Sequence, residues 1–161
     1  MKMETEKIDA ILEHNGSNRA GLIAILQDIQ KEYNYLPQEA LCYVAQKLNV
    51  PLIDVYCVAS FFKSFSLKPR GKHLVTVCLG TACHVKRAPF LLDEIEKRLG
   101  IRPGENTEDM EFTLETVNCL GACALAPIVV VDGEYHGQTT IKKVGPMLSK
   151  YRSEAKEEEN S

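Results

Sequence analysis

The 161-residue chain has no apolar run close to the roughly 18 to 20 residues that a membrane helix needs. Its N-terminus, Met1 to Ile11, is rich in acidic residues and lacks the apolar stretch of a secretory signal peptide. Lysines and arginines are scattered, the formal net charge is -3, and no basic stripe is interleaved with aromatic residues. We therefore expect a cytoplasmic protein with no direct membrane insertion and no nucleic-acid partner.

The sequence also lacks the motifs of a self-contained enzyme. It has no Gly-x-Gly-x-x-Gly or Walker pattern and no apparent Ser, His and Asp arrangement. Its 45% apolar and 25% charged residues are typical of a folded globular protein. Because the chain carries six cysteines without an export signal, a metal or redox use of these thiols is favoured over a disulfide framework.

The first part of the chain has the apolar periodicity of helices. Apolar residues at three- and four-residue steps predict a helix from Arg19 to Tyr33. Pro37 and Pro51 each open a further helix, at positions where the missing proline N–H costs little. We expect the last of these helices to bury Leu52, Val55, Tyr56, Ala59 and Phe62. Residues 1–66 thus form an N-terminal helical unit, and 67–72, with Pro, Gly and basic residues, form an exposed linker.

The second part alternates between strand and helix patterns. The predicted elements are a strand at 73–78, a helix at 89–99, a strand at 112–116, a hairpin of two strands turning at Asp132-Gly133, and a helix at 140–151. Gly145-Pro146 should kink or interrupt the last helix. This order predicts a thioredoxin-like α/β domain with a mixed sheet over residues 73–152, followed by a disordered acidic tail at 153–161.

Four of the six cysteines form two closely spaced pairs. Cys78 and Cys83 enclose Leu-Gly-Thr-Ala after the first predicted strand of this domain, and Cys119 and Cys123 enclose Leu-Gly-Ala after the next. If these strands are neighbours in one sheet, their exit loops meet at one end and bring the four thiolates together. The small residues of both loops leave room for backbone N–H groups to approach the sulfides of a cluster.

The spacing alone leaves different kinds of site open. Zinc accepts four cysteines with about two to four residues inside each pair, so a zinc-stapled structural adaptor is a serious alternative. A thioredoxin-like dithiol needs Cys-x-x-Cys, which neither pair has. Plant-type ferredoxins place three of their cysteines in one loop, so an iron–sulfur site in this chain requires another family.

Longer stretches around the cysteines resemble a known family. These stretches are Val77–His84, Glu115–Pro127, Tyr35–Pro37 and Pro69–His73. They closely resemble the thioredoxin-like 2Fe-2S subunit of NADH dehydrogenases, a subunit of complex I, and its relatives in NAD-linked or electron-bifurcating hydrogenases and formate dehydrogenases. The resemblance runs over roughly residues 17–150. Its specific part is the combination of C-x4-C and C-x3-C with Leu-Gly in both loops.

The resemblance implies one 2Fe-2S cluster, with Cys78 and Cys83 on one iron and Cys119 and Cys123 on the other. It also implies an N-terminal helical bundle followed by a thioredoxin-like domain, in agreement with the residue patterns. The chain would be an electron-transfer subunit that exchanges single electrons with an FMN- and NAD(H)-binding flavoprotein, next to a further iron–sulfur catalytic subunit. A free-standing ferredoxin is another possibility. The chain departs from the family at 56–62 and at Gly145-Pro146, and neither stretch contains one of the four ligands.

Several further residues could have a functional role, but each also has a purely structural interpretation. Cys42 and Cys57 lack a partner at ligand spacing, so we expect them to be small apolar residues that are buried or half-buried. His84 follows a ligand, where it is either a hydrogen-bond donor to sulfur or a surface histidine. Basic residues beside the first loop either offset the charge of a thiolate-ligated cluster and steer an acidic partner, or are ordinary solvated side chains. The candidates are Arg70, Lys72, Lys86 and Arg87. A cis peptide before Pro127 would help to shape the second loop.

Overall fold

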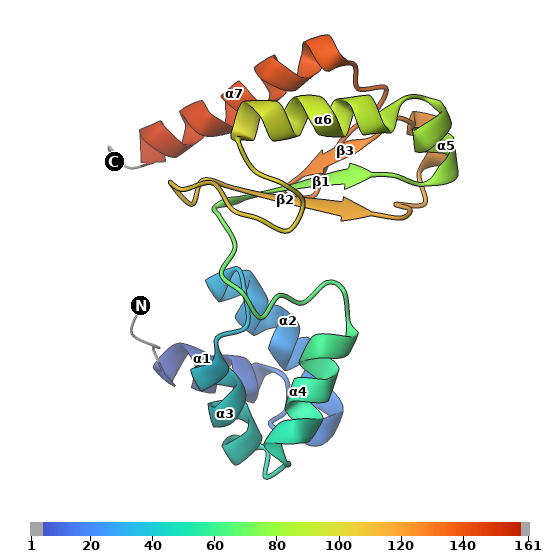
Figure 1. Ribbon diagram of the computed structural model, residues 1–161. Helices are drawn as coiled ribbons and strands as arrows, with labels where there is room; N and C mark the ends of the chain where they lie inside the picture. Colours follow the sequence, from blue (N-terminus) through green and yellow to red (C-terminus); the bar gives the residue numbers. More distant parts are fainter. Residues whose placement is uncertain (1–4, 159–161) are drawn as a thin grey trace. The chain divides into compact units, whose positions relative to one another are not determined.

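The computed structural model describes residues 5–158, and the chain divides into two compact units, residues 1–70 and 71–161. The division falls inside the predicted linker. The first unit is helical, with α1 (Thr5–His14), a 3-10 turn η1 (Arg19–Gly21), α2 (Leu22–Tyr33), α3 (Gln38–Lys47) and α4 (Leu52–Phe61) (Figure 1). The sequence patterns predicted α2, α3 and α4 but not α1.

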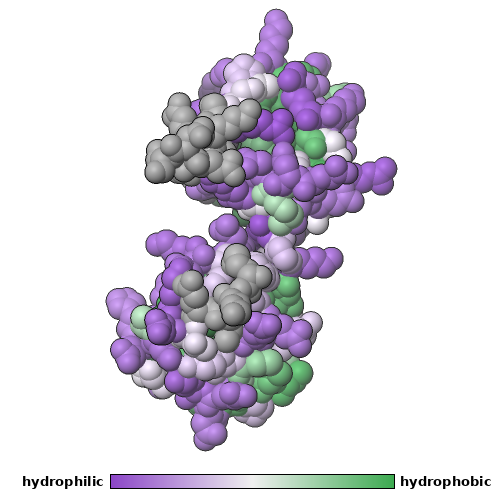
Figure 2. Space-filling model, turned by 90° about the vertical axis from the view of Figure 1, so that its left-hand side faces the viewer, coloured by the Kyte–Doolittle hydropathy of each residue, from purple (hydrophilic) through white to green (hydrophobic). Residues whose placement is uncertain are grey.

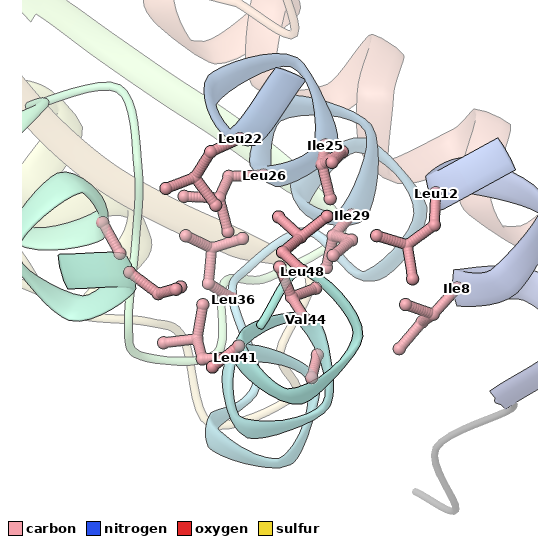
Figure 3. Close-up of a cluster of buried hydrophobic side chains, with 14 of the residues drawn as sticks. Ile8, Leu12, Leu22, Ile25, Leu26, Ile29, Leu36, Leu41, Val44 and Leu48 are labelled. Carbon is pink, nitrogen blue, oxygen red and sulfur yellow. The ribbon is translucent and has the colours of Figure 1, made fainter. Parts of the chain in front are cut away.

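One apolar core holds the helical unit together. Figure 3 shows its labelled side chains from α1, α2 and α3 pointing toward one another. Helix α1 packs on this core through Ile8 and Leu12, which are four residues apart and lie on one face of the helix. Asn34, in the left-handed region at φ 64°, ends α2, and the extended residues Pro37 and Pro51 precede α3 and α4. The two prolines in the sequence therefore correctly predicted where α3 and α4 begin.

The predicted burial of α4 is only partly right. Val55 and Ala59 are buried, whereas Leu52, Tyr56 and Phe62 are 44%, 50% and 37% exposed. When a helix is apolar on most sides, its sequence does not show which side is buried, because there is no polar face to mark the solvent side. Apolar patches accordingly interrupt the hydrophilic surface of the helical unit, which is the lower part of Figure 2.

The second unit is built on a four-stranded mixed sheet, as predicted. Its elements are β1 (His73–Cys78), α5 (Thr81–Val85), α6 (Ala88–Leu99), β2 (Phe112–Val117), a 3-10 turn η2 (Cys123–Leu125), β3 (Val129–Val131), β4 (Glu134–His136) and α7 (Ile141–Glu158). The strand order is β2-β1-β3-β4; β1 and β2 run parallel, and the other neighbours run antiparallel. The predicted α/β class is thereby confirmed.

Helices α6 and α7 cover the sheet and enclose a second core. In Figure 1 they lie side by side over the strands. The core joins apolar side chains of the strands to those of both helices, among them Val75, Val77, Leu114, Val129, Leu91, Ile95, Val144 and Leu148. At the hairpin, Asp132 and Gly133 both have positive φ, 49° and 87°, as a type I′ turn requires. The core and the hairpin together fix the strands whose ends carry the cysteines.

Gly145-Pro146 was predicted to kink or interrupt the last helix; α7 runs through Pro146 without a break, so the interruption does not occur. Val144, Met147, Leu148 and Tyr151 are buried at three- and four-residue steps and hold the helix against the sheet. The helix continues to Glu158, into the segment predicted as a disordered tail, and residues 159–161 of that segment lie outside the described residues. Within the described part of the chain, no helix is both long and apolar enough to cross a bilayer.

Candidate metal centre

Both cysteine pairs lie at the same end of the sheet. Cys78 is the last residue of β1, and β2 ends at its register partner Val117, two residues before Cys119. Because β1 and β2 are parallel neighbours, their carboxyl ends and the loops that follow them are adjacent. Cys83 lies on α5 and Cys123 opens η2, immediately beyond these loops. The two cysteine loops thus lie at one end of the sheet, as the sequence predicted.

Gly80 fixes how closely the two loops approach. A Cβ atom at this position would lie 2.6 Å from the carbonyl oxygen of Asn118 and 3.5 Å from Cα of Cys119. Just before it, the N–H of Leu79 donates to the carbonyl of Val117 at 2.9 Å. From the sequence, the small residues of the loops were expected to let backbone N–H groups approach a cluster. Nothing in the sequence indicated that Gly80 also packs on the backbone of the other cysteine loop.

The four thiols differ in their exposure to solvent. Cys78 and Cys83 are buried at 3% and 1% exposure, in a cluster with Ala88, Ala126, Ile128 and Val130, whereas Cys119 and Cys123 are exposed. Burial, and after it a hydrogen bond with the Cys78 thiol, raises the pKa of Cys83. The charges of Cys78 and Cys123 act in the same direction. The site therefore has an inner pair and an outer pair of sulfur atoms.

The second loop provides a backbone donor to one sulfur. The N–H of Gly121 donates to Sγ of Cys119 at 3.3 Å. Gly121 has φ +76°, a conformation that glycine adopts at little cost. Hydrogen bonds of this kind stabilise negative charge on a coordinating thiolate and raise the potential of an iron–sulfur centre. Glycine between the two outer cysteines thus allows this contact at little conformational cost.

The donor set fits a 2Fe-2S cluster in kind, because such clusters are held by four cysteine thiolates. All six cysteines are free thiols, and four of them lie as two pairs on or directly after two adjacent loops, which approach each other closely at Gly80. Among the described residues, no three His, Cys, Asp or Glu side chains are grouped as ligands of a single ion. Cys42 and Cys57 lie on α3 and α4 of the other unit; Cys42 is half-buried as expected, but Cys57 is exposed, because α4 buries only Val55 and Ala59.

The prediction that basic residues flank the first cysteine loop is right for Lys86 and wrong for Lys72. Lys86 caps α5, and its Nζ donates to the carbonyl of Ala126 beyond the second cysteine pair at 3.3 Å. Lys72, in contrast, precedes β1, about 20 Å of strand away from Cys78. His84 is exposed on α5. The Ala126–Pro127 peptide is cis, as expected.

The sequence profile of the thioredoxin-like [2Fe-2S] ferredoxin family matches residues 8–152. The chain belongs to this family. The predicted resemblance is confirmed, because the match includes both cysteine loops and most of the helical unit. The thioredoxin-like fold assigned to the second unit follows from the same match.

Curated relatives of this ferredoxin-family chain cover most of its length. The NADP-reducing hydrogenase subunit HndA of Solidesulfovibrio fructosivorans is 40% identical over 130 residues, which are 81% of this chain and 76% of HndA. An NADH-quinone oxidoreductase subunit of Rhizobium meliloti (strain 1021) is 36% identical over 148 residues, 92% of this chain and 88% of that relative.

A solved structure shares the fold. The crystal structure of an NAD+-reducing [NiFe]-hydrogenase in the air-oxidised state superposes with a TM-score of 0.73 at 19% identity. The superposition covers 83% of this chain but only 23% of the hydrogenase chain. At that identity the likeness concerns the fold alone.

Proposed function

We propose that this chain is an electron-transfer subunit with one 2Fe-2S cluster on Cys78, Cys83, Cys119 and Cys123. The inner pair, Cys78 and Cys83, would bind one iron and the outer pair the other. The observation that carries this proposal is the meeting of the two cysteine loops at the carboxyl ends of parallel neighbours β1 and β2. Family membership supports the choice of iron and sulfide over zinc.

Residues around the four cysteines adapt the site to electron exchange. When bound, the cluster supplies one-electron chemistry. Apolar residues pack on the inner pair and exclude water from it; they include Leu79, Ala82, Leu120 and Ala122. The outer pair is exposed and offers a partner an approach to the cluster through Cys119 and Cys123. The Gly121 N–H directed at Cys119 stabilises negative charge at this outer edge.

We further propose that the chain works in the cytoplasm within a multi-subunit NAD(P)H-linked oxidoreductase. Its partners would be an FMN- and NAD(H)-binding flavoprotein, which exchanges single electrons with the cluster, and a further iron–sulfur catalytic subunit. The names of the relatives support this, since they are subunits of an NADP-reducing hydrogenase and of NADH-quinone oxidoreductases. The complete complex would be a hydrogenase, electron-bifurcating or not, a formate dehydrogenase or a quinone reductase.

The cluster is tested by purifying the chain anaerobically and measuring iron, sulfide and zinc. We expect two irons and two sulfides per chain, a red-brown visible spectrum and a rhombic resonance signal after reduction. Serine replacement of Cys78, Cys83, Cys119 or Cys123 should change or abolish that signal. Cys42→Ser and Cys57→Ser are matched controls and should leave it unchanged. A colourless protein with stoichiometric zinc and no sulfide would instead support the structural adaptor.

The partner is tested by tagging the chain in its native host and purifying it under anaerobic conditions. We expect a flavoprotein that contains FMN and oxidises or reduces NAD(P)(H) to co-purify in a fixed ratio. The identity of the remaining subunits then separates hydrogenase, formate dehydrogenase and quinone reductase. Recovery of a stable monomer that exchanges electrons with several unrelated enzymes would contradict the subunit role and favour a free-standing ferredoxin.

A further inference from the structure

Lys86 connects the chain segments that follow the two cysteine pairs. Its Nζ donates to the carbonyl oxygen of Ala126 at 3.3 Å. Lys86 follows Cys83 by three residues at the end of α5, and Ala126 follows Cys123 by three residues after η2. The contact therefore connects the segment after the inner pair to the segment after the outer pair.

Ala126 places this contact beside the buried thiols. It is 1% exposed and belongs to the same buried cluster as Cys78 and Cys83. Its N–H donates to the carbonyl of Cys123 at 3.1 Å. The ammonium group is thus held against backbone that packs on one cysteine pair and hydrogen-bonds the other loop.

No carboxylate of either cysteine loop neutralises the ammonium charge. The sequence contains neither Asp nor Glu from residue 79 to 92 or from 116 to 131. The acceptor of the Lys86 side chain is a neutral carbonyl, which orients the ammonium group without cancelling its charge. This hydrogen bond directs the exposed Lys86 side chain, with its positive charge, toward the backbone that follows the second cysteine pair.

We propose that Lys86 raises the reduction potential of the 2Fe-2S cluster, an inference that rests on the proposed function. Reduction adds one electron and therefore one negative charge to a thiolate-ligated centre. A cation nearby stabilises the reduced state more than the oxidised state, and so favours reduction. Charge and hydrogen bonds around the ligands are established means by which proteins set iron–sulfur potentials.

The test is a redox titration of the holoprotein followed by visible absorbance and by the resonance signal of the reduced cluster. In Lys86→Gln the ratio of reduced to oxidised cluster at a fixed potential should fall about threefold, which is a shift of about 30 mV to more negative potential. Lys86→Arg keeps the charge and should restore the wild-type potential. Lys97→Gln removes an exposed lysine further along the same unit and should have no effect. Raising the ionic strength should reduce the difference between wild type and Lys86→Gln.

The outcomes separate this inference from the proposed function. A wild-type potential in Lys86→Gln, with the cluster present, would overturn the role of Lys86 and leave the cluster assignment intact. A wild-type protein without iron and sulfide would overturn the proposed function instead. Lys86→Met provides a second uncharged variant. If both uncharged variants lost the cluster while Lys86→Arg kept it, Lys86 would be needed to retain the cluster, and the tuning role would be rejected.

Discussion

Gly80 sets the distance between the two cysteine loops, so the smallest possible substitution there should have a large effect. In Gly80→Ala the new methyl group would meet the Asn118 carbonyl at 2.6 Å, and backbone must move to relieve the overlap. We expect a loss of about 1 to 3 kcal/mol in the free energy of unfolding. We also expect a lower iron-to-protein ratio, because the outer cysteines shift relative to the inner ones. Urea unfolding and iron analysis measure the two effects.

Gly145 offers a matched control for this substitution. A Cβ there would also meet a close atom, at 2.8 Å, but that atom is Nη1 at the far end of the flexible Arg98 side chain. Gly145→Ala should therefore be tolerated, with a gain of up to about 1 kcal/mol from replacing glycine inside a helix. Equal losses for Gly80→Ala and Gly145→Ala would show that contact with Asn118 has no special importance.

Glu134 gives the second unit a stability that depends on pH. Tyr151 donates to its Oε2 at 2.6 Å, and this hydrogen bond, followed by that from Lys150, lowers the pKa of Glu134 below its ordinary value of 4.5. Because the pKa is lowered in the folded state, the carboxylate stabilises the fold above pH 4.5. This contribution is lost as the pH falls through the folded-state pKa.

The prediction is a smaller pH dependence in Glu134→Gln. Urea unfolding at pH 7 and at about pH 3 should show wild type losing more stability than the variant on acidification, in the direction set by linkage. Tyr151→Phe removes the main cause of the lowered Glu134 pKa, so this variant should also lose less stability on acidification than wild type. If wild type and Tyr151→Phe lost equal stability on acidification, the Tyr151 hydrogen bond would not be the source of the effect.

The predictable part of the site is local in sequence. The spacing of Cys78 and Cys83, and of Cys119 and Cys123, follows directly from the sequence, as does their position after two strands. The contact of Lys86 with Ala126 spans 40 residues, and nothing in either segment indicates it. The prediction that Lys72 lies beside the first cysteine loop was wrong because of the converse error. Nearness in sequence suggested nearness in space, although a strand separates Lys72 from Cys78.

At the scale of elements, periodicity predicted most helices and strands because their buried faces are distinct. Helix α6, which buries Ala88, Leu91 and Ile95, is an example; the strands around Asp132-Gly133 were predicted instead from a β-branched run and the turn residues. Helix α1 was missed because its buried face has only Ile8 and Leu12, too few residues for a clear pattern among polar neighbours. Helix α4 was found, but its almost uniformly apolar sequence did not identify its buried side.

Pro146 shows how tertiary packing overrides a local signal in α7. Its missing N–H leaves the carbonyl four residues earlier without its helical donor, yet the buried face of α7 keeps the helix continuous. Pro146 is exposed, so Pro146→Ala should restore a backbone hydrogen bond with little loss of packing. We expect the free energy of unfolding to rise by about 1 to 3 kcal/mol, measured by urea unfolding.

Pro89 provides the control for this substitution within the same unit. It lies in the first turn of α6, where a proline needs no helical N–H partner. Pro89→Ala should therefore change stability much less than Pro146→Ala. A destabilised Pro146→Ala protein would indicate that the proline, rather than the buried face, holds this turn of α7 in place.

At the scale of the whole molecule, each compact unit has its own apolar core. The helical unit is organised around side chains such as Ile25, Leu26 and Val44, and the second unit around Val75, Ile95 and Leu114. A separate buried core is the usual condition for independent folding. All four candidate ligands and the Lys86 contact lie in residues 71–161. The candidate cluster site therefore lies within one unit.

A fragment of residues 71–161 should fold alone and assemble the cluster. We expect it to have the same ratio of iron to sulfide and the same visible and resonance spectra as the full chain, because every contact described at the cysteine loops is internal to it. The fragment of residues 1–70 is the control and should be helical by circular dichroism but contain no iron or sulfide. A folded 71–161 fragment that takes up no cluster, under conditions that load the full chain, would show that the helical unit contributes to assembly. The cluster site would then depend on both units of the chain.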